Sequence, residues 1–80
     1  MQTNEEKLKQ LLADVFGIPA DTVGEETSYE NVVNWDSLNQ MRLVLALEQS
    51  FRLSFSEQEL GSLTSYARIR EALKTHGVHQ

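Results

Sequence analysis

The sequence predicts an all-α fold, a small bundle of three main helices and one short helix with a long loop between the first two. Three observations lead to this prediction. Apolar residues recur at the spacing of a helix face in separate segments, most of these segments follow a residue suited to a helix N-cap, and no stretch shows convincing strand alternation. A chain of 80 residues can bury one core, so we expect a single domain over residues 1–80.

The first predicted helix covers residues 4–15. Thr3 or Asn4 can cap it, and the acids of its first turn lie where the helix dipole favours negative charge. Gly17 can end the helix, and Pro19 prevents its resumption. Its apolar face consists of residues at helical spacing: Leu8, Leu11, Leu12 and Val15.

Residues 18–35 form the long loop, which contains one proline, one glycine and four acids. Loops of this length are uncommon in compact domains and are often functional. We expect five apolar side chains to pin this loop to the core: Ile18, Val23, Tyr29, Val32 and Val33.

The second predicted helix covers residues 37–50 and follows Asp36, a good N-cap. It is apolar over most of its circumference, and so small a domain cannot enclose it completely. We expect the inward side chains to be Leu43, Leu47 and Phe51. We expect the side chains nearer the surface to be Leu38, Met41 and Leu45.

A short third helix is predicted over residues 56–60, where Ser56 and Glu59 form a capping-box pattern. The fourth helix is predicted over residues 65–75, capped by Thr64 or Ser65. Gly61 and Gly77 can end these two helices. The apolar stripe of the fourth helix consists of Tyr66, Ile69, Ala72 and Leu73.

The composition argues against an enzyme and against a metal site. The chain has no cysteine, which excludes disulfides and thiolate chemistry. Its two histidines, His76 and His79, stand among the last five residues, and we expect neither to be catalytic or metal-binding. The paired acids are expected to be solvated surface carboxylates: Glu5 with Glu6, Glu25 with Glu26, and Glu57 with Glu59.

The charge is uneven, with eight acids and two bases in residues 1–36 and four acids and five bases in residues 37–80. The absence of a basic stripe argues against nucleic-acid binding. No apolar run reaches the roughly 18 residues that span a bilayer, and the acidic start lacks a signal peptide's pattern. We therefore expect a cytoplasmic monomer that binds neither nucleic acid nor membrane.

Ser37 is the candidate functional residue, in the run Asp36-Ser37-Leu38 at the predicted start of a helix. Its hydroxyl can point to solvent, and a phosphodiester there would lie near unpaired N–H groups and the positive end of the helix dipole. The tripeptide alone favours an ordinary capped helix start over an attachment site. The residues around the tripeptide are therefore needed to distinguish an attachment site from an ordinary helix start.

That context is a pattern over most of the chain. It consists of Val15-Phe16-Gly17-Ile18, the acidic loop, Asp36-Ser37-Leu38, Leu43-Val44-Leu45-Ala46-Leu47-Glu48, Phe51, Leu53-Ser54-Phe55 with residues 56–60, and Leu63-Thr64-Ser65. In these residues the sequence resembles the acyl carrier protein family. The resemblance implies one acyl-carrier-type domain with 4′-phosphopantetheine attached to Ser37, flanked by Asp36 and Leu38.

The resemblance also implies the partners. A phosphopantetheinyl transferase, which needs Mg²⁺, would move the arm from coenzyme A to Ser37. Acyl-loading and acyl-processing enzymes would then use the arm's thiol, which holds acyl groups as thioesters, in fatty acid, polyketide or related specialised biosynthesis. The chain is thus expected to be a carrier and not an enzyme.

Two residues depart from the family pattern. The family's second helix is its usual partner surface and is often acidic, but here it carries Arg42 and only one acid, Glu48. Trp35, a bulky aromatic, precedes the motif; it can pack the loop end, or guide the arm and contact partners. The departures favour a specialised pathway. The expected partner-binding residues are Trp35, Leu38, Met41, Arg42 and Leu45.

Two other functions stay open. The chain can be an unmodified helical interaction module that docks a partner through exposed apolar residues. It can also be an aminoacyl or peptidyl carrier, although Asn34-Trp35-Asp36 lacks the glycine-rich approach that such carriers usually show. For an acyl carrier we expect a cleft beside the second helix, bounded by Leu43, Val44, Leu47, Phe51, Leu60 and Ile69.

Overall fold

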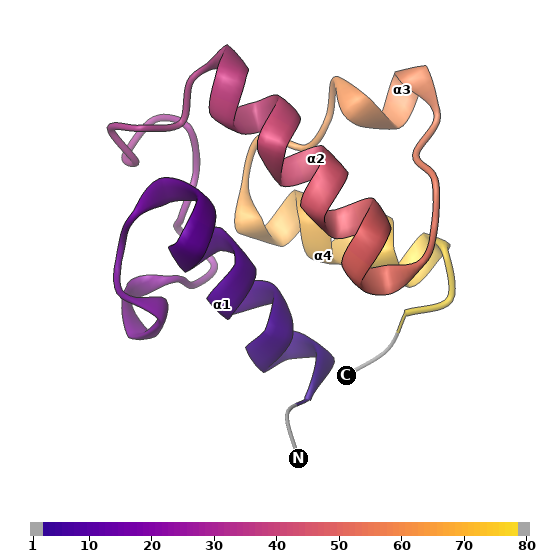
Figure 1. The fold of residues 1–80 in the computed structure, drawn as a ribbon, viewed down its shortest axis with the longest axis horizontal. Helices are drawn as coiled ribbons and strands as arrows, with labels where there is room; N and C mark the ends of the chain where they lie inside the picture. Colours follow the sequence, from indigo (N-terminus) through magenta and orange to yellow (C-terminus); the bar gives the residue numbers. More distant parts are fainter. Residues whose placement is uncertain (1–2, 79–80) are drawn as a thin grey trace.

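The computed structural model describes residues 3–78; His79 lies outside this range. The helices are α1 (Asn4–Phe16), α2 (Ser37–Phe51), α3 (Glu57–Leu60) and α4 (Tyr66–Thr75), with a single 3₁₀ turn, η1 (Ala20–Thr22), after α1. Figure 1 shows α1 and α2 running in opposite directions beside each other, with α4 behind them. Within the described residues there is no strand, so the predicted all-α bundle is confirmed.

The helix starts are fixed by side-chain caps, as their sequences indicate. Thr3 Oγ1 accepts from the Glu6 N–H at 3.0 Å, and Ser65 accepts from the Arg68 N–H at 3.1 Å. These two residues, and not their alternatives, are therefore the caps of α1 and α4. Ser56 and Glu59 form both bonds of the capping box at the start of α3. Each observed helix end lies within one residue of the expected one.

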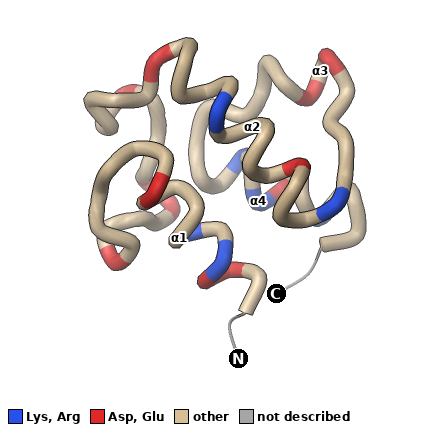
Figure 2. The backbone as a smooth tube through the Cα atoms, viewed as in Figure 1, with Lys and Arg blue, Asp and Glu red and all other residues tan. Residues whose placement is uncertain are grey.

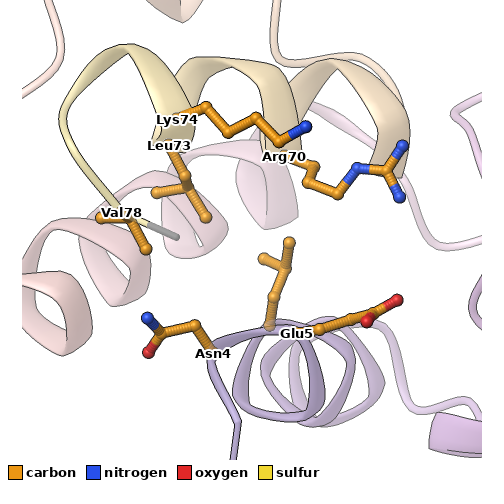
Figure 3. Close-up of a pocket in the computed structure, with 7 residues that line it drawn as sticks. Asn4, Glu5, Arg70, Leu73, Lys74 and Val78 are labelled. Atoms are coloured by element: carbon orange, nitrogen blue, oxygen red, sulfur yellow. The ribbon is translucent and has the colours of Figure 1, made fainter. Parts of the chain in front are cut away.

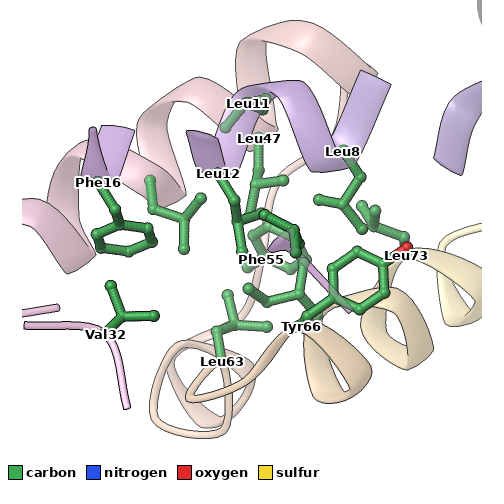
Figure 4. Close-up of a cluster of buried hydrophobic side chains, with 13 residues drawn as sticks. Leu8, Leu11, Leu12, Phe16, Val32, Leu47, Phe55, Leu63, Tyr66 and Leu73 are labelled. Atoms are coloured by element: carbon green, nitrogen blue, oxygen red, sulfur yellow. The ribbon is translucent and has the colours of Figure 1, made fainter. Parts of the chain in front are cut away.

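The core lies between α1, α2 and α4, and Figure 4 shows side chains from all three helices meeting there. Leu43 and Leu47 of α2 are fully buried, as predicted, and Phe51 is half-buried against the core. From α1 and α4 the core receives Leu8, Leu11, Leu12, Phe16, Tyr66, Ile69 and Leu73. This packing fixes which face of α2 remains outside.

The long loop is held to the core by fewer residues than expected. Val23 and Val32 are buried, and Ile18 is half-buried. The expectation for Tyr29 and Val33 is wrong, because they are 56% and 98% exposed. The turn in which Ser28 O accepts from the Val32 N–H directs Val32 inward and leaves the adjacent Val33 in solvent.

The expected cleft beside α2 is wrong for this structure. Leu43, Leu47 and Ile69 have no exposed surface, so no open space exists at half of its predicted boundary. A pocket does lie between α1 and α4, where Leu8, Leu73 and Val78 meet Arg70 (Figure 3). Its volume is about 20 Å³, which suits a water molecule and not an acyl chain.

Candidate functional site

Ser37 is the first residue of α2, and its side chain is exposed. Asp36 precedes it in an extended conformation, and its Oδ1 accepts from the Asn39 N–H at 2.9 Å, as expected of an N-cap. Within residues 3–78 the Ser37 hydroxyl makes no hydrogen bond to the protein. The cap therefore uses the neighbouring carboxylate and leaves this hydroxyl available for chemistry.

Asn34 ties the approach to Ser37 onto the rest of the fold. Its Nδ2 donates to the Phe16 carbonyl at 3.0 Å, and its own carbonyl accepts from the Asn39 side chain at 2.8 Å. The end of α1 and the start of α2 are thus joined through Asn34, by its own side chain on one side and by the Asn39 side chain on the other. This role could not be predicted from the sequence, because Phe16 lies 18 residues before Asn34 along the chain.

Trp35 packs on the same junction. Its ring stacks on Phe16 with the centroids 4.5 Å apart, and its Nε1–H donates to Gln40 Oε1 at 2.5 Å. Gln40 in turn donates from Nε2 to the Leu63 carbonyl at 2.9 Å. The packing role considered for Trp35 is therefore observed, and its contact with partners stays a prediction. Gln40 is a positioning residue that the sequence did not single out.

A shallow groove begins beside Ser37 and runs toward α3. Its volume is about 380 Å³. Its lining residues are Tyr29, Trp35, Asp36, Ser37, Gln40, Leu60, Gly61 and Thr64. An elongated group bonded to Ser37 could lie in this groove or extend freely into solvent, so the surroundings of the hydroxyl fit a long covalent attachment.

The outer face of α2 adjoins Ser37. Leu38, Met41 and Leu45 are 61%, 65% and 53% exposed, which confirms their predicted position near the surface. Arg42 is exposed between them. The partner-binding role of this face stays a prediction, since single exposed apolar side chains are common on protein surfaces.

The perturbed titrations lie away from the groove. Hydrogen bonding to the Ser56 backbone N–H lowers the pKa of Glu59, and burial raises the pKa of Tyr66. A hydrogen bond from Arg70 to Glu25 raises the pKa of the guanidinium. None of these three groups lines the groove beside Ser37, so the groups with shifted pKa values are separate from the candidate site.

No group of side chains suited to a metal ion occurs in the part of the chain that the structure describes. His76 contacts Glu59, with 2.8 Å between Nε2 and Oε2.

None of the helices between residues 3 and 78 is long and apolar enough to cross a membrane. No histidine is among the residues that line the groove beside Ser37, so none of them can serve as a histidine base for its hydroxyl.

A comparison with protein families matches residues 6–73, most of the chain, to a family described as "Phosphopantetheine attachment site". This family carries 4′-phosphopantetheine covalently, and its domains are in general carriers without catalytic activity. The match includes all of α2 and α3 and most of α1 and α4. The predicted resemblance is confirmed at this level: the chain belongs to the phosphopantetheine attachment site family.

Proposed function

We propose that this phosphopantetheine carrier is an acyl carrier protein whose arm is attached to Ser37. The observation that carries the proposal is the exposed, unbonded hydroxyl at the first position of α2. The protein acts as a cytoplasmic monomer in fatty acid, polyketide or related specialised biosynthesis. The arm supplies a terminal thiol that holds the acyl group as a thioester.

The helix start is suited to the modification. In the transfer, a bond forms between Ser37 Oγ and the phosphorus that bears pantetheine, and the pyrophosphate bond of coenzyme A breaks to release 3′,5′-ADP. The hydroxyl proton passes to a base of the transferase. The N-terminus of α2 then stabilises the phosphodiester by about 0.3–1 kcal/mol.

Intact-mass spectrometry after incubation with coenzyme A, Mg²⁺ and a broad-range transferase tests this function. We expect a gain of one phosphopantetheinyl group in the native chain and in Ser54→Ala, which removes another exposed serine. We expect no gain in Ser37→Ala. If a control carrier is modified and this chain is not, the proposal fails and an unmodified interaction module becomes the better account.

A further inference from the structure

Gln40 lies between the attachment residue and the core on one side of α2. Ser37, Gln40 and Leu43 are spaced three residues apart, so they follow one another along the helix surface. Ser37 is exposed, Gln40 is half-buried and Leu43 is fully buried. A chain bonded to Ser37 that turned along this side of α2 would therefore meet Gln40 before it reached the core.

Gln40 also joins α2 to the segment opposite, residues 61–65, which connects α3 to α4. Its Nε2 donates to the carbonyl of Leu63, a fully buried residue, and no other hydrogen bond within residues 3–78 joins α2 to this segment. Figure 2 shows no charged position in residues 61–65 or in residues 37–41 at the start of α2. The two segments are thus held together by an amide and not by an ion pair.

Trp35 holds the Gln40 side chain in this position. The indole N–H donates to Gln40 Oε1, and the indole ring stacks on Phe16, which is itself fully buried. Both ends of the Gln40 amide are therefore engaged, and moving the side chain aside breaks two hydrogen bonds. Because polar groups removed from water are costly to leave without a partner, this bridge resists opening.

From this arrangement we propose that Gln40 is a barrier that keeps the acyl group of the loaded carrier out of the core. The proposal rests on attachment of the arm at Ser37. The groove beside Ser37 is lined by Gln40 but not by Leu43 or Leu63, so the groove ends at this amide. The acyl group then stays in the groove or in solvent, where exposed CH₂ groups are unfavourable. The cargo that suits this carrier is a short or oxygen-bearing acyl group and not a long saturated chain.

The melting temperature of the carrier loaded with acetyl or octanoyl groups tests the barrier. A broad-range transferase with Mg²⁺ loads each group from its coenzyme A thioester, and intact mass confirms the loading. A chain that enters the core stabilises the folded state, because the chain is buried only there. In the native carrier we expect the octanoyl form to differ from the acetyl form by less than about 2 °C in Tm.

Two variants remove the barrier. Gln40→Ala leaves space beside Leu63, and Gln40→Met removes both hydrogen bonds while it keeps a side chain of similar length, which guards against a loss of folding in the first variant. In each variant we expect the octanoyl form to melt about 4–8 °C above the acetyl form. Gln49→Ala, which removes an exposed amide from the same helix, is the control and should behave as the native carrier does.

Methyl NMR spectra of the same samples report where the chain lies. The octanoyl chain should shift the methyl signals of Leu43 and Leu47 in the Gln40 variants and leave them unchanged in the native carrier. The proposal is overturned if the octanoyl chain shifts these signals and raises the Tm of the native carrier, or if the folded Gln40 variants exclude the chain as the native carrier does. A carrier that cannot be loaded contradicts the arm at Ser37, whereas loaded carriers with these results contradict only the barrier.

Discussion

At the scale of single residues, Asp36 and Ser37 have different tasks at one helix start. The Asp36 carboxylate satisfies the Asn39 N–H, so the serine beside it is not needed as a cap. Ser37 lies just inside the helix, with its hydroxyl outside the hydrogen-bond ladder. Exposure of the hydroxyl is thus a consequence of the residue that precedes it.

The cap can be tested by substitution. Asp36→Ala should lower the free energy of unfolding by about 1 kcal/mol, because it leaves an N–H of the first turn without a partner. Asp36→Asn should keep most of the stability, since its amide oxygen can accept the same bond. Urea unfolding followed by circular dichroism measures both. A loss in Asp36→Ala no larger than in Glu30→Ala, an exposed loop acid, would contradict this role.

Residue roles that depend on near neighbours were predictable from the sequence. The Asp36 cap and the Ser56–Glu59 capping box each involve residues within three positions. The stacking of Trp35 on Phe16 joins residues 19 positions apart, and only the folded loop brings them together. For this reason the sequence could place Trp35 beside the motif but could not decide what it contacts.

At the scale of elements, the site depends on a junction between the end of α1, the start of α2 and the segment before α4. Gln40 accepts from Trp35, which stacks on Phe16, and donates to the Leu63 carbonyl, so Trp35 and Gln40 together join these parts. The backbone adds a second connection, in which the Tyr66 N–H donates to the Thr27 carbonyl at 2.9 Å. Together these bonds fix the long loop to α2 and to the segment before α4, next to Ser37.

Gln40→Ala should lower the free energy of unfolding by about 1–3 kcal/mol, because it leaves the Trp35 N–H and the Leu63 carbonyl without their partner. Gln49→Ala, at an exposed position of the same helix, is the control and should change stability by less than about 0.5 kcal/mol. Urea titration monitored by Trp35 fluorescence gives both values. Equal losses in the two variants would show that the Gln40 hydrogen bonds contribute nothing to stability.

The helices were easier to predict than the loop between them. Periodicity and caps defined the main helices to within one residue, because both signals are local. The loop has no period, so its apolar residues gave no indication of which ones point inward. That is why Val23 and Val32 were expected correctly and Tyr29 and Val33 were not.

At the scale of the whole molecule, α2 packs one face into the core and exposes the other to solvent. Its inner face is buried between α1 and α4, and its outer face remains available beside Ser37. The sequence predicted this division from the apolar circumference of the helix. It did not predict the closed core, since the fit of three helices against one another is not visible in the pattern of any one of them.

Two leucines of α2 test the division directly. Leu47→Ala should lower the free energy of unfolding by about 2–5 kcal/mol, because Leu47 is fully buried and its loss leaves a cavity. Leu45→Ala, where the native side chain is 53% exposed, should cost less than about 1 kcal/mol. Thermal or urea unfolding of both variants measures these changes in the free energy of unfolding. Similar losses would contradict the assignment of the inner and outer faces.

The central claim is that the arm is attached to Ser37, and peptide mapping of the modified protein tests it most directly. After incubation with coenzyme A, Mg²⁺ and a transferase, the protein is digested and each serine-containing peptide is fragmented. The account predicts phosphopantetheine on Ser37 alone, at the exposed start of α2. Modification at any other serine, with Ser37 unmodified, would contradict it.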